Sequence, residues 1–552
     1  NLQEDITPAF YDTLNTRVMI YDTSDLPNQL TLLEQKDIQG SFRDVRAIGS
    51  DIHMVTTAGL NTYTLLSQHV DRWQPQFADL SEDEYKEAAR TAAEKYIPQF
   101  VDIVIRDISL GGDIPELSQI SLWQSVLSNE TESIFSDSPI NSYTQLTSFD
   151  VSTITSSDDN SATVTYSVAG TFTPSSWGYT YAVGDMLVFA MQGWGWVAEL
   201  EGSGETTYLV GFTLDGASAT PTAVGAFPGY LLNQYSLDIY EGHLRIATTI
   251  RSFWVGVLPE ITPVDEEETN GDMDTDTLPV VWERRWGTKN QVLILEIPTI
   301  GGDSSSNVFT EVSRIPDLGK PGEVFTTVRF FDDRAYAVTF ERTDPFYVLD
   351  LDAQNPSVLG ELNITGFSSY LHSINEDNSL LLAIGQEADE NGRILGLQIT
   401  MFDATNATDP ALLHRHVVEQ KKDVWSSSSV EFDFKAFRYV SLGTTDGVGI
   451  LILPLRVSSW QNVENGNFDG FRVYDVSKTD GIRERMEISH VEWDAFYGCY
   501  YDAYLPERSF VFDGDVTTMK GHSIVSTDLD SGVQEWKLEM PEPTNKDNCI
   551  YW

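Results

Sequence analysis

The sequence has 552 residues, of which 41% are hydrophobic, enough for a substantial core. Its 84 acidic and 34 basic residues leave a formal net charge of −50 at pH 7. A field of this sign repels nucleic acid and anionic membranes, and no apolar run reaches the roughly 18 residues that a membrane-spanning helix needs. We therefore expect no nucleic-acid partner and no direct membrane insertion.

The acidic charge also bears on location. Repulsion among so many carboxylates is screened by salt, because the Debye length is about 8 Å at physiological ionic strength and shorter in brine. This favours a secreted or cell-surface protein in a saline or marine setting; the alternative is that the acidic surface only keeps the chain soluble. Asn1 is not an initiator methionine, which indicates a processed or trimmed N-terminus.

The first expected element is a pair of strands, Val18–Leu33, that flank an Asp-led turn. We call such a pair an outer hairpin. No earlier strand pair precedes it, so either it closes a ring against C-terminal strands or residues upstream of Asn1 supplied its partner. The next expected pair, Val45–Thr56, is rich in β-branched residues and aligns without a gap with Val328–Thr339. We call this second kind an inner hairpin.

A helical insertion is expected next. Ser81–Glu84 has the sequence of a capping box, and Tyr85 and Tyr96 fall on one helical face with Ala89 and Ala92 between them. We expect Pro98 to start a second helix, Gln99–Ile108, because proline is favoured in a first turn. Both helices are expected to pack on the strands.

The clearest repeat is Val328–Leu362, which reads as four short strands separated by turns. Its first two strands form an inner hairpin and its last two an outer hairpin. Further outer hairpins are expected at Leu209–Phe227, Gln291–Ile315, Ile399–Val418, Phe471–Ile488 and Ile524–Met540. Further inner hairpins are expected at Tyr181–Met191, Tyr235–Thr249, Tyr370–Gly385, Phe432–Gly443 and Tyr504–Met519.

Radial repetition of four-stranded sheets predicts such regular spacing. The expected fold class is therefore all-β: a β-propeller of four-stranded antiparallel blades, seven of them, or eight if upstream residues complete a blade. The expected divisions are first propeller strands in 1–66, a partly helical insertion in 67–142, and the remaining blades in 143–552, with an acidic loop at 259–277.

These blocks resemble a known family of secreted proteins that carry a C-terminal β-propeller domain and have no assigned reaction. The resemblance rests on Gly229–Thr249, Pro321–Leu362, Gly366–His372 and Ser427–Val440. It implies a propeller fold and secretion. Phe434 departs from the pattern, since such proteins commonly have histidine there.

The sequence contains no nucleophile elbow, phosphate-binding glycine loop, His-Glu-x-x-His or Cys-x-x-Cys motif. His414 and His416 could bind metal from one strand face, although we favour a solvated pair. A calcium site is possible because Asp272, Asp274, Asp276 and Glu283 stand at positions 1, 3, 5 and 12 of a calcium-loop spacing. Thr277 replaces the usual glycine, so a solvated acidic loop is the alternative.

A second near-match to that spacing, Asn465-x-Asn467-x-Asp469-Gly470, lacks the closing glutamate and is interpreted as a plain turn. No cofactor other than calcium is expected.

Three further features suit an extracellular protein. Cys499 and Cys549 are expected to form a disulfide, which would contribute roughly 4 kcal/mol by closing a loop of about 50 residues. The sequons at Asn129, Asn363 and Asn406 are candidates for glycosylation. Three tryptophans could stack on sugar rings, with wedging between blades as the alternative: Trp177, Trp194 and Trp196.

Three functions remain open from the sequence. The favoured one is a secreted binding or structural scaffold for an extracellular protein, glycan or cell-surface assembly, with self-assembly possible. The second is an extracellular hydrolase or lyase with its site in the central channel of the propeller. The third is a subunit of a cell-surface or filament assembly that makes contact through the helical insertion.

Overall fold

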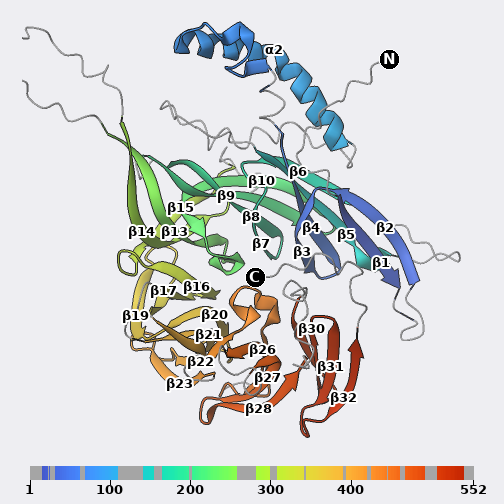
Figure 1. Cartoon of the computed structure of the whole chain (residues 1–552), viewed down its shortest axis with the longest axis vertical. Helices are drawn as coiled ribbons and strands as arrows, with labels where there is room; N and C mark the ends of the chain where they lie inside the picture. The colour runs from blue at the N-terminus through green and yellow to red at the C-terminus, as the bar shows by residue number, and fades with distance from the viewer. Residues whose placement is uncertain are drawn as a thin grey trace, which may run out of the picture. The chain divides into compact units, whose positions relative to one another are not determined.

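The computed structural model describes residues 15–22, 24, 31–61, 67, 69–109, 141–154, 164–197, 202–257, 281–298, 307–340, 344–389, 393–418, 424–443, 446–459, 467–490 and 506–539 (Figure 1). The chain divides into two compact units. The first comprises Asn1–Gly287 and Ile294–Val312, and the second comprises Thr288–Leu293 and Ser313–Trp552. Antiparallel sheets dominate both units, as the all-β expectation requires.

The repeat predicted at Val328–Leu362 forms one four-stranded sheet in the second unit. Its strands hydrogen-bond in chain order, and Asp332 takes a left-handed conformation (φ 44°) in the first turn. The prediction of a complete blade is confirmed. The strands are β16 (Val324–Phe331), β17 (Arg334–Phe340), β18 (Asp344–Asp350) and β19 (Ser357–Ile364).

Three more sheets follow in the second unit, coloured from yellow to red in Figure 1. The first contains β20 (Phe367–Ser373), β21 (Leu380–Ala388), β22 (Ile394–Asp403) and β23 (Ala411–Val417). The second contains β24 (Val424–Ser427), β25 (Arg438–Ser441), β26 (Gly449–Ser459), β27 (Phe468–Ser477) and β28 (Gly481–Ser489). The third contains β29 (Arg508–Phe512), β30 (Asp515–Lys520), β31 (Ser523–Asp528) and β32 (Gln534–Glu539).

One predicted inner hairpin is wrong in detail. Within Phe432–Gly443 only β25 is a strand, and it pairs with β26 beyond the predicted range. The preceding residues form two 3-10 turns, η7 (Ser429–Glu431) and η8 (Phe434–Ala436). Ser428 and Asp433 accept hydrogen bonds from backbone N–H groups of these turns, and such local bonds compete with strand pairing. The other inner hairpins and all the outer hairpins form where predicted.

Neighbouring sheets of the second unit pack through buried apolar faces. Phe346 of β18 stacks on Tyr336 of β17 and on Phe402 of β22, with ring centroids 5.7 and 4.5 Å apart. All three rings are fully buried. A second cluster, which includes Phe471 of β27 and Val516 of β30, joins the last two sheets. Stacked sheets thus bury the alternate residues that the strand pattern predicts.

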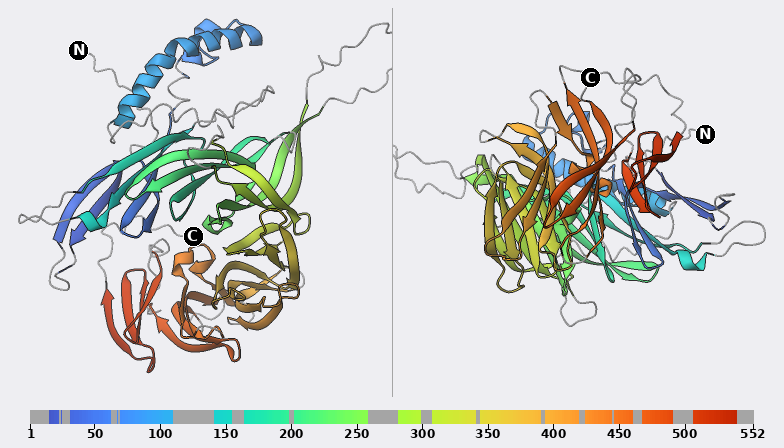
Figure 2. Two further views of the ribbon diagram at one scale, coloured as in Figure 1. Left: turned by 180° about the vertical axis from the view of Figure 1, so that it is seen from behind. Right: turned by 90° about the horizontal axis from the view of Figure 1, so that it is seen from below.

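The first unit contains a two-stranded sheet, a four-stranded sheet and most of a nine-stranded sheet, whose long strands are green and teal in Figure 2. The two-stranded sheet is β1 (Asn15–Asp22) with β2 (Thr31–Gln39). The four-stranded sheet is β3 (Ser41–Ile48), β4 (Asp51–Gly59), β5 (Ser142–Asp150) and β6 (Ser167–Thr173). The nine-stranded sheet is β7 (Gly178–Val183), β8 (Met186–Val197), β9 (Gly202–Asp215), β10 (Ser218–Pro228), β11 (Tyr230–Leu231), β12 (Leu237–Tyr240), β13 (His243–Val257), β14 (Val281–Glu296) and β15 (Thr310–Leu318).

The nine-stranded sheet merges two of the expected repeats. The strand β13 continues past the predicted hairpin, and its residues Phe253–Val255 pair with Gly202–Gly204 of β9. This extension joins two sheets that the sequence pattern treats as separate blades. The core of the unit includes Leu146 of β5 and Phe212 of β9, both fully buried.

The aligned strands β3 and β16 have β-bulges at equivalent positions. The register of β3 with β4 shifts between Phe42 and Asp44, and that of β16 with β17 shifts between Phe325 and Thr327. These positions correspond in the ungapped alignment, so the β-bulge repeats with the sequence. The repeated bulge supports the prediction that the sheets are copies of one unit.

The predicted helical insertion forms one long helix, α2 (Glu82–Ser109), with Pro98 inside it. The expectation of a second helix starting at Pro98 is wrong: a proline removes one backbone hydrogen bond, and here the helix continues past it. Among the described residues, no helix combines the length and the hydropathy that a membrane-spanning segment requires.

The N-terminus of α2 has the predicted capping box. The Ser81 backbone N–H donates to the Glu84 carboxylate (2.9 Å), and the Glu84 backbone N–H donates to Ser81 Oγ (3.4 Å). Tyr96 stacks on His69 at 3.4 Å, and the Tyr85 hydroxyl donates to the Val70 carbonyl (2.8 Å). The predicted helical face therefore contacts the segment just before the helix.

Candidate functional site

A buried ion network joins the last two sheets of the second unit. Lys520 Nζ on β30 lies 2.6 Å from Asp469 Oδ1 on β27 and 2.6 Å from Glu507 Oε1, just before β29. Arg456 Nη2 on β26 lies 3.0 Å from Asp469 Oδ2. Ser429 Oγ donates to Glu507 Oε2 (2.5 Å). Two carboxylates and two cations balance in charge, so the network can remain ionised while buried.

No sequence motif predicted this network, and the pattern at Asn465–Gly470 predicted a turn. Asp469 instead lies within β27, and its side chain faces partners that are far away in the sequence. A charged residue in a strand where its neighbours are apolar was the available signal.

His490 adjoins the ion network. Its two ring nitrogens lie 2.6 Å from Ser523 Oγ and 2.8 Å from Thr518 Oγ1. Burial, together with the positive charge of Lys520 and against the opposing negative charge of Asp469, lowers its pKa from 6.5 to about 4. The imidazole is therefore neutral in the folded protein at pH 7.

We expect the neutral state of His490 to make the protein acid-sensitive. As pH falls, the unfolded chain takes up the proton near pH 6.5, whereas the folded chain takes it up only near pH 4. The contribution of His490 to the free energy of unfolding is therefore fully present above about pH 6.5. It falls by about 3 kcal/mol as the pH drops towards 4. Urea unfolding at pH 7 and 4.5 measures the loss, and His490→Asn should reduce the difference. An unchanged difference in that variant would refute this role for His490.

The predicted histidine pair lies on β23 against the next sheet. His414 Nε2 is 2.8 Å from the Lys478 carbonyl, and the His416 ring contacts the Tyr474 ring edge-on at 5.3 Å. Burial lowers the pKa of His416, and the positive charge of Arg472 adds to the effect. The interpretation as a solvated pair is therefore wrong, because both side chains are partly buried between sheets.

An aromatic cluster lies on the inner hairpins of the second unit. Tyr370 on β20 stacks on Phe434 of η8 at 5.2 Å and contacts Phe437 at 4.9 Å. His372 packs on Phe437, and burial, with the charge of Arg329, lowers its pKa to about 4. Phe434, the departure from the resembled family, therefore fills a place in an apolar stack.

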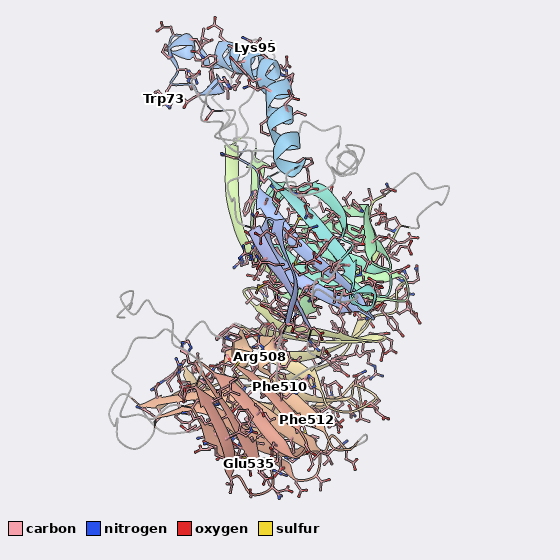
Figure 3. All side chains as sticks on the ribbon, turned by 90° about the vertical axis from the view of Figure 1, so that its right-hand side faces the viewer. Trp73, Lys95, Arg508, Phe510, Phe512 and Glu535 are labelled. Carbon is pink, nitrogen blue, oxygen red and sulfur yellow. The ribbon has the colours of Figure 1, made fainter. Side chains whose placement is uncertain are left out.

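Within the second unit, an apolar surface on the sheet β29–β32 is exposed. We define the aromatic face as Phe510, Phe512, Trp536 and Leu538, which are 55%, 81%, 47% and 53% exposed. Phe510 pairs with Thr517, Thr517 with Ser526 and Ser526 with Trp536, so the two rings lie on one face of the sheet. Figure 3 labels Phe510 and Phe512 along β29. The opposite face, with Val516 and Val525, packs against the preceding sheet.

Of the three tryptophans predicted to form a binding surface, the structure describes the side chains of Trp177 and Trp194. Trp177 is 47% exposed and contacts Tyr179 edge-on at 5.2 Å. Its carbonyl accepts from the Gln192 backbone N–H (3.3 Å), two residues before the half-buried Trp194. The backbone of Trp196 lies in β8, and its side chain is outside the described residues.

Several predicted sites lie outside the described residues: Cys499, Cys549, Asn129, Asp272, Asp274 and Asp276. Glu283 is described only as backbone within β14. Within the part of the chain that the structure describes, no group of three or more His, Cys, Asp or Glu side chains is arranged to hold a metal ion. The disulfide and the calcium loop stay predictions.

Comparison with known proteins gives the family. The family model described as "Beta propeller domain" matches residues 2–532, and the chain belongs to this family. A curated uncharacterized protein of Methanocaldococcus jannaschii is 36% identical over 214 residues, which cover 39% of this chain and 26% of that protein. An uncharacterized protein of Archaeoglobus fulgidus is 30% identical over 314 residues, 56% of this chain and 37% of that one. The matches thus span less than half the length of these relatives.

Solved structures resemble the chain more distantly. The periplasmic gluconolactonase of Pseudomonas aeruginosa has a TM-score of 0.30 and 11% identity, covering 74% of this chain and 95% of that one. Dihydro-heme d1 dehydrogenase NirN has a TM-score of 0.37 and 11% identity, covering 87% and 83%.

Proposed function

We propose that this chain is an extracellular binding scaffold that holds a protein partner against the aromatic face. The observation that carries the proposal is the exposure of Phe510, Phe512, Trp536 and Leu538 together on one sheet. Large apolar side chains gathered on a surface are typical of protein contacts, and aromatic residues contribute most at such contacts. The net charge of −50 is consistent with a chain that works in a saline extracellular medium.

Charge around the aromatic face indicates the chemistry of the partner. Asp513, Asp515, Asp528 and Asp530 lie in or beside the turns at the Phe512 end of the sheet. A complementary surface would have an apolar centre bordered by lysine or arginine. Such a pair associates faster at low salt, because opposite charges steer the encounter.

The contacts of the histidines support binding in preference to catalysis. His53 lies 2.9 Å from Ser148 Oγ, and His490 bonds hydroxyl groups as well. His414 bonds a backbone carbonyl, and His372 packs on aromatic rings. The contacts of His372, His414 and His490 join neighbouring sheets, and the contact of His53 joins two strands of one sheet. They occupy groups that an acid–base mechanism would need.

The test is a variant of the aromatic face. The double change Phe512→Ser and Trp536→Ser should weaken binding to surface-protein extract from the source cells at least tenfold, because removing two central aromatic contacts costs more than about 1.4 kcal/mol. The matched control is Phe432→Ser, since Phe432 is 78% exposed in the same unit and lies outside the face. Affinity is measured by biolayer interferometry with the purified chain immobilised.

Treatment of the extract separates the possible partners. Protease digestion should abolish binding, and periodate oxidation of glycans should leave it intact. If periodate abolished binding and protease left it intact, the partner would be a glycan and not a protein. If light scattering showed that the chain associates with itself, the partner would be a second copy of the chain. Turnover of a glycoside, ester or peptide substrate that one substitution in this chain abolishes would refute the scaffold and favour the hydrolase.

A further inference from the structure

Two described sequons differ in how their hydroxyl residue is engaged. In the Asn406 sequon, Asn406 and Thr408 are both exposed in the turn between β22 and β23. In the Asn363 sequon, Asn363 is exposed near the end of β19, but Thr365 is half-buried. An enzyme that glycosylates asparagine must reach both the amide and the hydroxyl two residues later. The two sites can therefore be compared directly.

The Asn406 turn presents a sequon on a fixed backbone. The Asp409 backbone N–H donates to the Asn406 carbonyl (3.0 Å), and the Thr405 backbone N–H donates to Asp403 Oδ1 (2.8 Å). A side chain on Gly360 of β19 would overlap the Ala407 carbonyl, so the turn rests directly on the neighbouring sheet. These contacts hold the backbone and leave the side chains of Asn406 and Thr408 exposed.

The hydroxyl of Thr408 is exposed beside the Asn406 side-chain amide, so a glycosylating enzyme can reach both groups. Thr408 Oγ1 donates to Asn406 Oδ1 at 3.0 Å, and this contact between two exposed groups is easily exchanged for contact with another protein.

The hydroxyl of Thr365 is held by a charged network instead. It donates to Glu387 Oε1 (2.9 Å) and accepts from Arg415 Nη1 (2.9 Å). Arg415 Nη1 also lies 2.7 Å from Glu387 Oε2, and the Glu387 side chain is 8% exposed. Asn363 Nδ2 itself donates to Glu361 Oε1 (3.1 Å). Freeing Thr365 would leave a buried carboxylate with one fewer donor.

From this contrast we infer that Asn406 is a glycosylation site of the folded protein and that Asn363 is not. The inference rests on the proposed extracellular location. The co-reactant is an oligosaccharide linked to a polyprenyl phosphate or diphosphate. Asn406 Nδ2 attacks the anomeric carbon, a C–N bond forms, and the bond from that carbon to the phosphate oxygen breaks. The lipid phosphate leaves with the electron pair, and the amide proton passes to a base on the transferase.

The experiment directs the full chain through the secretory route of a glycosylating host by an added signal peptide, and maps glycopeptides by mass spectrometry. Occupancy at Asn406 should exceed that at Asn363 at least fivefold. Thr408→Val should remove the glycan at Asn406, and Thr408→Ser should keep it, because serine preserves the hydroxyl. Circular dichroism confirms that both variants fold, as exposed turn substitutions should.

Three outcomes would overturn the inference: equal occupancy at the two sites, glycan at Asn363 alone, or secreted chain without glycan at either site. Binding by the Asn406→Gln chain is measured with the same surface extract used above. If the Asn406→Gln chain lacks the glycan and still binds normally, the glycan is not needed for binding, and the two proposals can be judged independently. Normal glycosylation of a chain that binds no surface protein contradicts the scaffold proposal and leaves this inference standing.

Discussion

Replacing Lys520 with methionine is expected to lower the free energy of unfolding by about 3–5 kcal/mol. The change leaves Asp469 and Glu507 facing each other without the ammonium group that lies 2.6 Å from both. Lys520 and Asp469 side chains are only 8% and 5% exposed, so water cannot replace the lost partner. Because the network joins two sheets, the loss should also loosen the last sheet from its neighbour.

The control for Lys520 lies two strands away in the same sheet. Lys537 on β32 forms a 2.6 Å ion pair with Glu539, and those side chains are 32% and 61% exposed. Lys537→Met should cost less than about 1 kcal/mol, since exposed ion pairs contribute little. Guanidinium unfolding followed by tryptophan fluorescence measures both variants. Equal effects of the two changes would contradict the assignment of the buried network as a structural link.

Replacing Phe346 with alanine is expected to cost about 3–5 kcal/mol, through lost burial and the cavity that remains. Phe346 is fully buried between Tyr336 and Phe402, and each ring contact adds about 0.5–1.5 kcal/mol beyond burial. The change removes the ring at the centre of a stack that spans two sheets. Unfolding should therefore shift as a whole to lower denaturant concentration.

The matched control is Phe432→Ala, which removes the same ring from a site 78% exposed. We expect it to change stability by less than about 0.5 kcal/mol. Thermal and guanidinium unfolding of both variants provide the measurement. A loss below about 1 kcal/mol for Phe346→Ala would mean that the sheets are not held together by this stack.

The sequence predicted the strands best where each sheet face had a regular pattern. In β16–β19, β-branched and aromatic residues alternate between turns led by Asp332 and Asp352, and all four strands form. The prediction failed where a side chain caps the backbone: Asp433 accepts a hydrogen bond from the Lys435 backbone N–H, and Phe434–Ala436 forms a 3-10 turn in place of the expected strand. It failed at Pro98 as well, because a preference for the first turn does not forbid the helix interior.

The candidate sites were less predictable, because they depend on residues that are distant in the sequence. Asp469, Glu507 and Lys520 come together only when two sheets stack, and 84 acidic residues offer no pattern that selects two of them. The aromatic face depends on which side of β29–β32 is covered by its neighbour. Alternation placed Phe510 and Phe512 on one side, but it could not assign that side to the surface.

The most direct test of the scaffold proposal is hydrogen–deuterium exchange of the purified chain with and without surface-protein extract from its source. We expect bound material to slow exchange in β29 and β32, around Phe510, Phe512 and Trp536, while the capped segment Ser81–Glu84 exchanges as before. Slowed exchange confined to α2 or to the Trp177 region, with β29 and β32 unchanged, would contradict the proposal that the aromatic face is the binding surface.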